Sequence, residues 1–172
     1  MPTKAVEAAI NDQIAKEFYA SHLYLSMAAW FEDQNLPGFG SWMRMQASEE
    51  HGHAMRLFDY VIEAGGRVRL QGLAEPPTDF KGPMQIMQES LKHEQKVTAS
   101  IRKLYELADK EKDYATQLHL QWFITEQLEE EKQVSDIIAR LKLAGDSPVA
   151  LLMIDGELGG RAPEAEGKGA AD

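Results

Sequence analysis

Four long stretches of the chain repeat apolar residues at intervals of three and four, the spacing that places them on one face of an α-helix. The stretches cover residues 5–34, 39–65, 83–110 and 113–142, and strand-like alternation is almost absent. This pattern predicts an all-α fold. Short breakers at 35–38 and 110–113 should make the first and second helices, and the third and fourth, into antiparallel hairpins.

The connection between the second and third stretches is long and irregular. It runs from Gly65 through Pro76 and Pro77 to Gly82, and Pro83 suits the first position of the next helix. A helix of about 28 residues is roughly 42 Å long, and about 17 residues of extended chain reach roughly 56 Å. We therefore expect a four-helix bundle with one long crossover along its whole length.

A short fifth helix is expected near the C-terminus. Ser147 can cap it, Pro148 suits its first turn, and residues 149–157 begin with an apolar run that leaves no polar side. Such a helix has to be buried, and contacts with other subunits are the expected place. Residues 1–158 are predicted to form one domain, and residues 159–172 a flexible tail.

The composition of the 172 residues excludes several classes of protein. There is no cysteine, so disulfides, thiolate metal sites and cysteine nucleophiles are excluded. The formal net charge of -10 argues against a nucleic-acid binder and suits a protein that attracts cations. The N-terminus lacks the apolar core of a secretory signal, and no apolar run reaches the ~18 residues that a membrane helix requires. A cytoplasmic protein with no membrane partner is therefore expected.

Acidic residues interrupt the inward-facing apolar stripe of every long helix. These stripes carry Glu17 on the first helix, Glu50 and His53 on the second, Glu94 on the third, and Gln127 and Glu130 on the fourth. Each acid lies near the middle of its helix, so the four should meet at one height in an antiparallel bundle. Burying a lone carboxylate has an effective penalty of several kcal/mol, and four would rival the ~5 to 15 kcal/mol that stabilises a domain. The acids must therefore be neutralised.

Bound metal is the expected partner of these acids. None of the four stripes carries Lys or Arg, which leaves protonation or metal binding. Four glutamates together with one E-x-x-H pair, Glu50 and His53, match the di-iron carboxylate pattern of helical bundles. Hard oxygen ligands with one imidazole suit Fe(II) or Mn(II) better than copper or structural zinc. Carboxylates buried only for packing reasons are the alternative interpretation.

Several motifs resemble those of the bacterial non-haem ferritins, from residue 5 to about residue 158. The motifs are N-D-Q-I-A-K-E-F-Y-A-S-H-L-Y-L, S-E-E-H-G-H-A, H-E-Q-K-V-T, W-F-I-T-E-Q-L-E-E-E-K and L-L-M-I-D-G-E-L. The resemblance implies a ferritin-like four-helix bundle in which Glu17, Glu50 and His53 bind one iron ion. Glu50, Glu94 and Glu130 would bind a second ion, with Glu50 bridging the two.

The resemblance also assigns residues around this pair of ions. Gln127 would form a hydrogen bond beside the ligands. Tyr24 matches a tyrosine that supplies an electron or a proton, although a core phenol with a satisfied hydroxyl is the other interpretation. A third, lower-affinity iron site would use Glu49, Glu126 and Glu129, for which a solvated acidic face is the alternative.

Haem is not expected in this chain. Haem-containing relatives repeat E-x-x-H on the fourth helix, where this sequence has Gln127 and Glu130, and carry a haem-binding Met where it has His51. Rubrerythrin-like peroxidases would need cysteine-bound iron. The remaining histidines are expected at surfaces or subunit contacts: His22, His51, His93 and His119.

As a function, the resemblance implies iron storage and detoxification by a ferroxidase. Fe(II) would be oxidised by O2 or H2O2 at the di-iron centre and stored as ferric mineral in a homo-oligomeric shell of twenty-four subunits. The short fifth helix would cluster at the fourfold axes of that shell. Two alternatives remain: a di-manganese or peroxide-consuming oxidoreductase of the same fold, and a non-catalytic binding protein whose acids hold a structural cation.

Overall fold

The computed structural model describes residues 2–160, and this part of the chain forms five α-helices and no strand. The helices are α1 (Lys4–Asp33), α2 (Pro37–Glu63), α3 (Pro83–Lys110), α4 (Tyr114–Ala144) and α5 (Pro148–Gly159). The predicted all-α fold, with four long helices and a short fifth helix, is confirmed. The end of the predicted tail, residues 161–172, lies outside the described residues.

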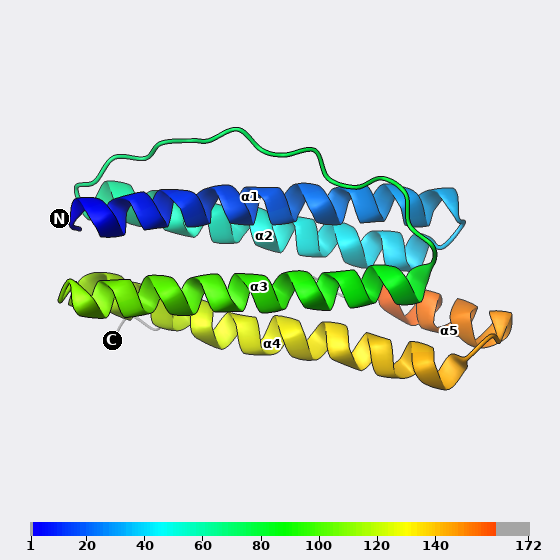
Figure 1. The fold of residues 1–172 in the computed structure, drawn as a ribbon. Coiled ribbons are helices and arrows are strands. Elements are labelled where there is room, and N and C mark those ends of the chain that lie inside the picture. Colours follow the sequence, from blue (N-terminus) through cyan, green and yellow to red (C-terminus); the bar gives the residue numbers. More distant parts are fainter. Residues whose placement is uncertain (1, 161–172) are drawn as a thin grey trace.

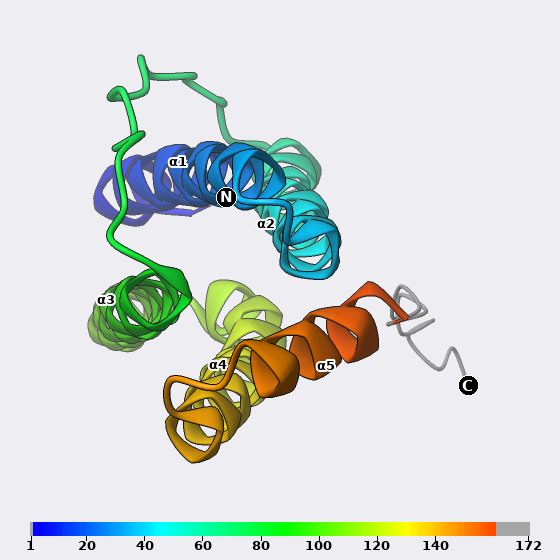
Figure 2. The ribbon, with the colours of Figure 1, turned by 90° about the vertical axis from the view of Figure 1, so that its right-hand side faces the viewer.

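The four long helices form two hairpins that lie against each other. Figure 1 shows α1 beside α2 and α3 beside α4, and the view along the bundle in Figure 2 shows all four helices surrounding a common interior. The segment between α2 and α3 runs along the outside of α1 from one end of the bundle to the other (Figure 1). The predicted crossover is therefore confirmed. Helix α5 lies across the end of the bundle at which α4 ends (Figure 2).

Helix starts follow the capping signals of the sequence. The Thr3 hydroxyl accepts a hydrogen bond from the Val6 amide (3.4 Å), and the carboxylate of Asp113 accepts one from the Thr116 amide (3.1 Å). Four helix ends differ from the prediction by two residues: both ends of α2 and the C-terminal ends of α4 and α5. Helix α2 already begins at Pro37, because proline suits a position without an amide donor, and α4 continues to Ala144 before Gly145 adopts a positive φ of 55°.

The start of the crossover is fixed to α1 by a buried asparagine. The Asn11 amide donates to the carbonyl oxygens of Glu7 (2.9 Å) and Arg67 (3.1 Å), and its oxygen accepts from the Arg69 amide (2.6 Å). Further along, the Ser26 hydroxyl donates to the Pro77 carbonyl (2.6 Å). The long segment therefore follows α1 because its own backbone groups find partners there.

The apolar core is divided into two clusters. In one cluster, α1 contributes residues before residue 15 of the chain and α2 contributes residues after residue 56. In the other, α1 contributes residues after residue 22 and α2 contributes residues before residue 48. Helices α3 and α4 divide in the same way, on either side of Glu94 and of Gln127 with Glu130. A polar layer thus crosses the middle of the bundle between two apolar halves.

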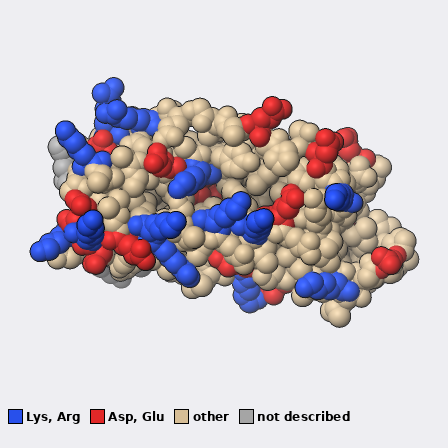
Figure 3. Space-filling model, in the orientation of Figure 1, with Lys and Arg blue, Asp and Glu red and all other residues tan. Residues whose placement is uncertain are grey.

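Helix α5 is buried on one side only within the chain. Ile154 and Leu158 are buried, whereas Val149, Leu152 and Met153 are exposed to 60–69%. The face shown in Figure 3 carries a band of Lys and Arg interspersed with Asp and Glu, so the excess negative charge is not gathered on this face. Within residues 2–160, no helix combines the length and apolar character needed to cross a membrane.

Candidate metal centre

Four glutamates and one histidine occupy the polar layer. Glu17, Glu50 and Glu94 have no exposed surface, and His53 and Glu130 are exposed by 5% and 3%. Each of the four long helices contributes at least one of them, because the three- and four-residue spacing of each stripe turns these positions inward. Their predicted inward orientation is confirmed.

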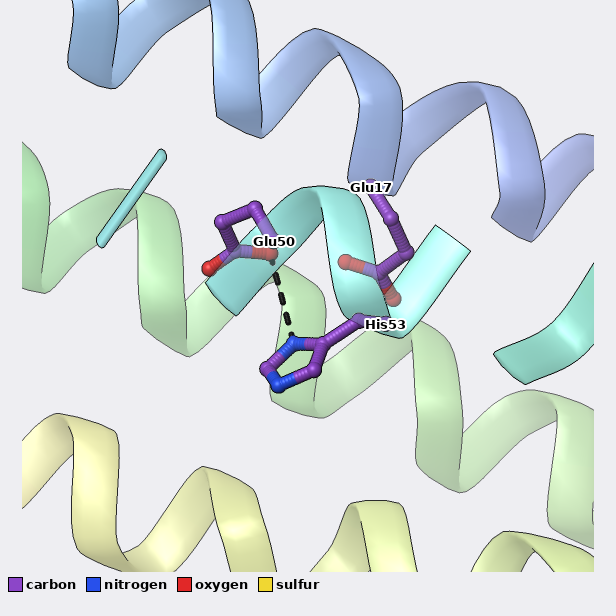
Figure 4. Close-up of side chains that lie close together, drawn as sticks. All are labelled: Glu17, Glu50 and His53. Carbon is purple, nitrogen blue, oxygen red and sulfur yellow. Dashed lines mark ion pairs between the residues drawn. The ribbon is translucent and has the colours of Figure 1, made fainter. Parts of the chain in front are cut away.

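The ligand atoms of these residues converge in two groups that share Glu50. Glu17, Glu50 and His53 form the first group, and Glu50, Glu94 and Glu130 form the second; within each group the atoms lie within 4.8 Å of one another. Figure 4 shows Glu17 extending from α1 toward Glu50 and His53 on α2. The imidazole Nδ1 of His53 lies 3.5 Å from Oε2 of Glu50 and 3.7 Å from Oε1 of Glu130. The arrangement can hold two adjacent cations with one shared carboxylate.

Several buried atoms of these groups have no hydrogen-bond partner within the described part of the chain. They are Oε2 of Glu17, both carboxylate oxygens of Glu50 and of Glu130, and Nδ1 of His53. No Lys or Arg is among the buried residues that the structure describes. Since buried polar atoms are normally paired, this set of acceptors fits divalent cations bound through oxygen and one imidazole.

Burial controls the protonation of the centre without metal. It raises the pKa of Glu17 to about 7 and the pKa of Glu50 and Glu130 well above the ordinary value, and the charges of neighbouring glutamates add to the last two shifts. Burial also lowers the pKa of His53 to about 4, helped by the charge of Arg56. The metal-free centre therefore keeps protons on its acids and presents a neutral imidazole.

Glu94 is held by two neighbours. The Tyr24 hydroxyl donates to its Oε1, and the Gln127 amide nitrogen donates to its Oε2 at 3.1 Å. Gln127 thus touches the centre as a hydrogen-bond donor. The pKa of Tyr24 lies well above its usual value because of burial and then the charge of Glu94, so the phenol keeps its proton.

The three acids of the expected third site are not brought together equally. Glu126 is half-buried and forms a further potential metal group with His53 and Glu130, whose ligand atoms lie within 4.8 Å. Glu49 is half-buried and Glu129 is exposed, and neither belongs to a potential metal group of the described residues. The proximity of Glu126 to His53 was not predicted, because Glu126 lies off the inward-facing stripe of α4.

Two of the remaining histidines are less exposed than the other two. His22 and His51 are exposed, but His93 and His119 are half-buried, and burial lowers the pKa of both to about 4. His119 stacks on Tyr60 with ring centroids 4.1 Å apart. These two side chains pack as neutral aromatic groups within the subunit.

Gln13, which lies one turn before Glu17, was not among the residues predicted for the centre. Its side chain is 1% exposed, and its amide nitrogen donates to Oε1 of Glu17 at 2.8 Å. The spacing could have identified Gln13, because residues four apart lie on the same face of a helix and Glu17 faces inward.

The sequence profile of the family described as "Ferritin-like domain" matches residues 7–144. Curated relatives named "Bacterial non-heme ferritin" include one from Bacteroides fragilis (strain 638R), 38% identical over 161 residues that cover 94% of this chain and 100% of the relative. Another, from Campylobacter jejuni, is 39% identical and covers 90% and 93%. An open pore ferritin from the archaeon Archaeoglobus fulgidus matches structurally with a TM-score of 0.93 at 44% identity, covering 94% and 100%. With its bundle and crossover fold, this chain belongs to the ferritin family.

Proposed function

We propose that this chain stores iron and acts as a ferroxidase, oxidising Fe(II) at a di-iron centre and keeping the ferric product as hydrous oxide. The observation that carries the proposal is the pair of buried ligand groups that share Glu50 and hold unpaired oxygen and nitrogen atoms. Curated relatives named as bacterial non-haem ferritins support it.

In the proposed reaction, Fe(II) is the substrate and the chain supplies its ligands. Glu17, Glu50 and His53 would hold one ion, and Glu50, Glu94 and Glu130 the other. Each ion loses one electron, so two Fe(II) reduce one O2 with two protons to one H2O2, or one H2O2 with two protons to two H2O. The acids release their own protons when metal binds, because the cations replace protons as the neutralising charge.

The surrounding residues keep this centre in order in the proposed reaction. Gln127 and Tyr24 would orient Glu94 through the hydrogen bonds described above. A weaker third ion would bind beside the pair through Glu126, with Glu49 and Glu129 completing its surroundings by moving toward it. Haem has no place in this proposal.

The assembly would be a homo-oligomeric cytoplasmic shell of twenty-four subunits that encloses the mineral. The exposed apolar residues Val149, Leu152 and Met153 support burial of α5 against other subunits, since a helix seldom leaves three large apolar side chains in water. The similarity to ferritins solved as an open pore form and as an engineered closed form also supports a shell.

The proposal is tested by the Glu50→Ala variant, which removes the ligand shared by both ions. Oxidation of Fe(II) followed by stopped-flow absorbance should slow by more than ~100-fold, because even groups behind the ligands are worth ~10–100-fold. Glu63→Ala, at an exposed position of the same helix, is the control and should retain the wild-type rate. Sedimentation of the three proteins should give one size, that of the shell. An unchanged rate for Glu50→Ala would show that oxidation occurs elsewhere.

A further inference from the structure

A chain of hydrogen bonds connects Glu17 to the surface of the bundle through Gln13. The Gln13 amide nitrogen donates to Oε1 of Glu17 at 2.8 Å. The Gln13 amide oxygen accepts from the Ser100 hydroxyl on α3 at 2.6 Å, and that hydroxyl accepts from the exposed Lys16 ammonium at 2.6 Å. The chain therefore leads from an exposed cation to a buried carboxylate.

The direction of every bond in this chain follows from the groups at its ends. The Lys16 ammonium can only donate, so the Ser100 oxygen accepts from it and gives its single proton to the Gln13 oxygen. This assigns the Gln13 oxygen to the side of Ser100 and turns its amide nitrogen toward Glu17. All three bonds then point toward the carboxylate, an arrangement in which successive bonds polarise one another.

The chain leaves the two oxygens of Glu17 unequal. Oε1 is engaged by Gln13, whereas Oε2 is buried and has no hydrogen-bond partner within the described part of the molecule. Glu50, which belongs to both ligand groups, has both oxygens in that unpartnered state. This difference suits a Glu17 carboxylate that binds one ion through one oxygen and a Glu50 carboxylate that binds two ions.

We propose that Gln13 is a positioning residue of the metal centre, which engages one oxygen of Glu17 so that Glu17 binds its ion through the other oxygen alone. Ser100 acts with it by fixing the orientation of the Gln13 amide. Because Gln13 and Ser100 lie on α1 and α3, the chain also sets the distance of Glu17 from the second hairpin. This inference rests on the proposed function, since it requires a metal at Glu17.

The test is a Co(II) titration of the assembled metal-free protein, followed by the visible d–d absorption of the bound ion. Gln13→Met preserves length and burial but removes the donor. It should weaken the binding of one of the two Co(II) ions by ~10-fold or more and alter its absorption bands, because Glu17 is then free to bind with both oxygens. Ser100→Ala should shift affinity and spectrum in the same direction by less. Gln88→Met, an exposed glutamine on α3, should match the wild type.

The outcomes separate this inference from the proposed function. If Glu50→Ala loses Co(II) but Gln13→Met keeps wild-type affinity and spectrum, the role of Gln13 is wrong and the metal centre stands. If Glu50→Ala binds Co(II) like the wild type, both are wrong. If Gln13→Met weakens both ions equally and lowers the melting temperature of the metal-free protein, Gln13 serves packing only and the inference is overturned.

Discussion

The buried glutamates should make the metal-free protein less stable as pH rises. Their pKa is raised by burial, to about 7 for Glu17 and well above the ordinary range for Glu130, so the folded state favours their protonated form. Their contribution to stability is complete below the unfolded value of 4.5 and is lost as pH rises through the folded pKa. His53, His93 and His119 act oppositely, because burial lowers their pKa from 6.5 to about 4. Their effect on the pH dependence of stability ends above pH 6.5. Above pH 6.5, the change of stability with pH is therefore set by the buried glutamates.

We therefore predict that the melting temperature without metal falls as pH rises from about 6.5 through the Glu17 pKa of about 7. Glu130→Gln should reduce this fall, because a neutral amide has no charge to bury, and it should melt above the wild type at alkaline pH. Calorimetry in the presence of a chelator measures the melting temperatures of the wild type and of Glu130→Gln across this pH range. Glu129→Gln changes an exposed neighbour on α4 and should follow the wild-type curve. Equal slopes for wild type and Glu130→Gln would contradict the prediction.

Among the elements, α5 is held on the first turn of α2 by a contact that needs both partners. The Asp155 carboxylate accepts a hydrogen bond from the Phe39 amide at 2.8 Å, where Leu36 provides no side-chain cap for α2. Gly38 leaves the space for this approach, since a Cβ there would lie 1.7 Å from the Asp155 carbonyl oxygen. Asp155 thus caps α2 from a distant part of the sequence.

Gly38→Ala should consequently displace α5, because the clash involves backbone atoms that cannot rotate away. Hydrogen exchange of the α5 amides should accelerate at least ~10-fold, and Asp155→Ala should cost about 1 kcal/mol of unfolding free energy through the lost cap. Gly52→Ala is the matched control on α2, with open space around the added methyl group. It should keep α5 protected and stabilise the helix by up to ~1 kcal/mol. Normal protection of α5 in Gly38→Ala would refute the contact.

For the molecule as a whole, metal should act as a link between the two hairpins. The ligand groups take Glu17, Glu50 and His53 from the α1–α2 hairpin, and Glu94 and Glu130 from the α3–α4 hairpin. A cation held by both hairpins stabilises the folded state alone, because the unfolded chain does not present these atoms together. Its binding energy therefore adds to the stability of the bundle.

Redox-inert Zn(II) at about 100 times its dissociation constant should add ~2.7 kcal/mol, which corresponds to a rise of roughly 5 to 10 °C in melting temperature. The double variant Glu94→Gln with Glu130→Gln leaves the ligands of the proposed ion pair on the α1–α2 hairpin only, and it should lose most of this rise. Glu63→Gln with Glu111→Gln, at two exposed positions, should keep it. A full rise in the first double variant would mean that zinc binds outside the centre.

The amino-acid sequence by itself determined the helices and the inward direction of the acids. Residues three and four apart share a helix face whatever surrounds them, so periodicity was enough to place Glu17, Glu50, Glu94 and Glu130 in the interior. Proline and capping residues located two helix starts for the same local reason, at Pro83 and at Ser147 with Pro148. That the connection could cross the whole bundle followed from helix rise and the reach of extended chain.

Only the tertiary structure decided which side-chain atoms meet. Ser100 reaches Gln13 across 87 positions, and Asp155 reaches Phe39 across 116, so no local pattern could pair them. The grouping of Glu126 with His53, rather than with Glu129, likewise depends on how α4 is rotated against α2. A sequence period gives the face of a helix, but the partner of each atom depends on side-chain rotamers and on distances between helices, which are set when the whole core packs.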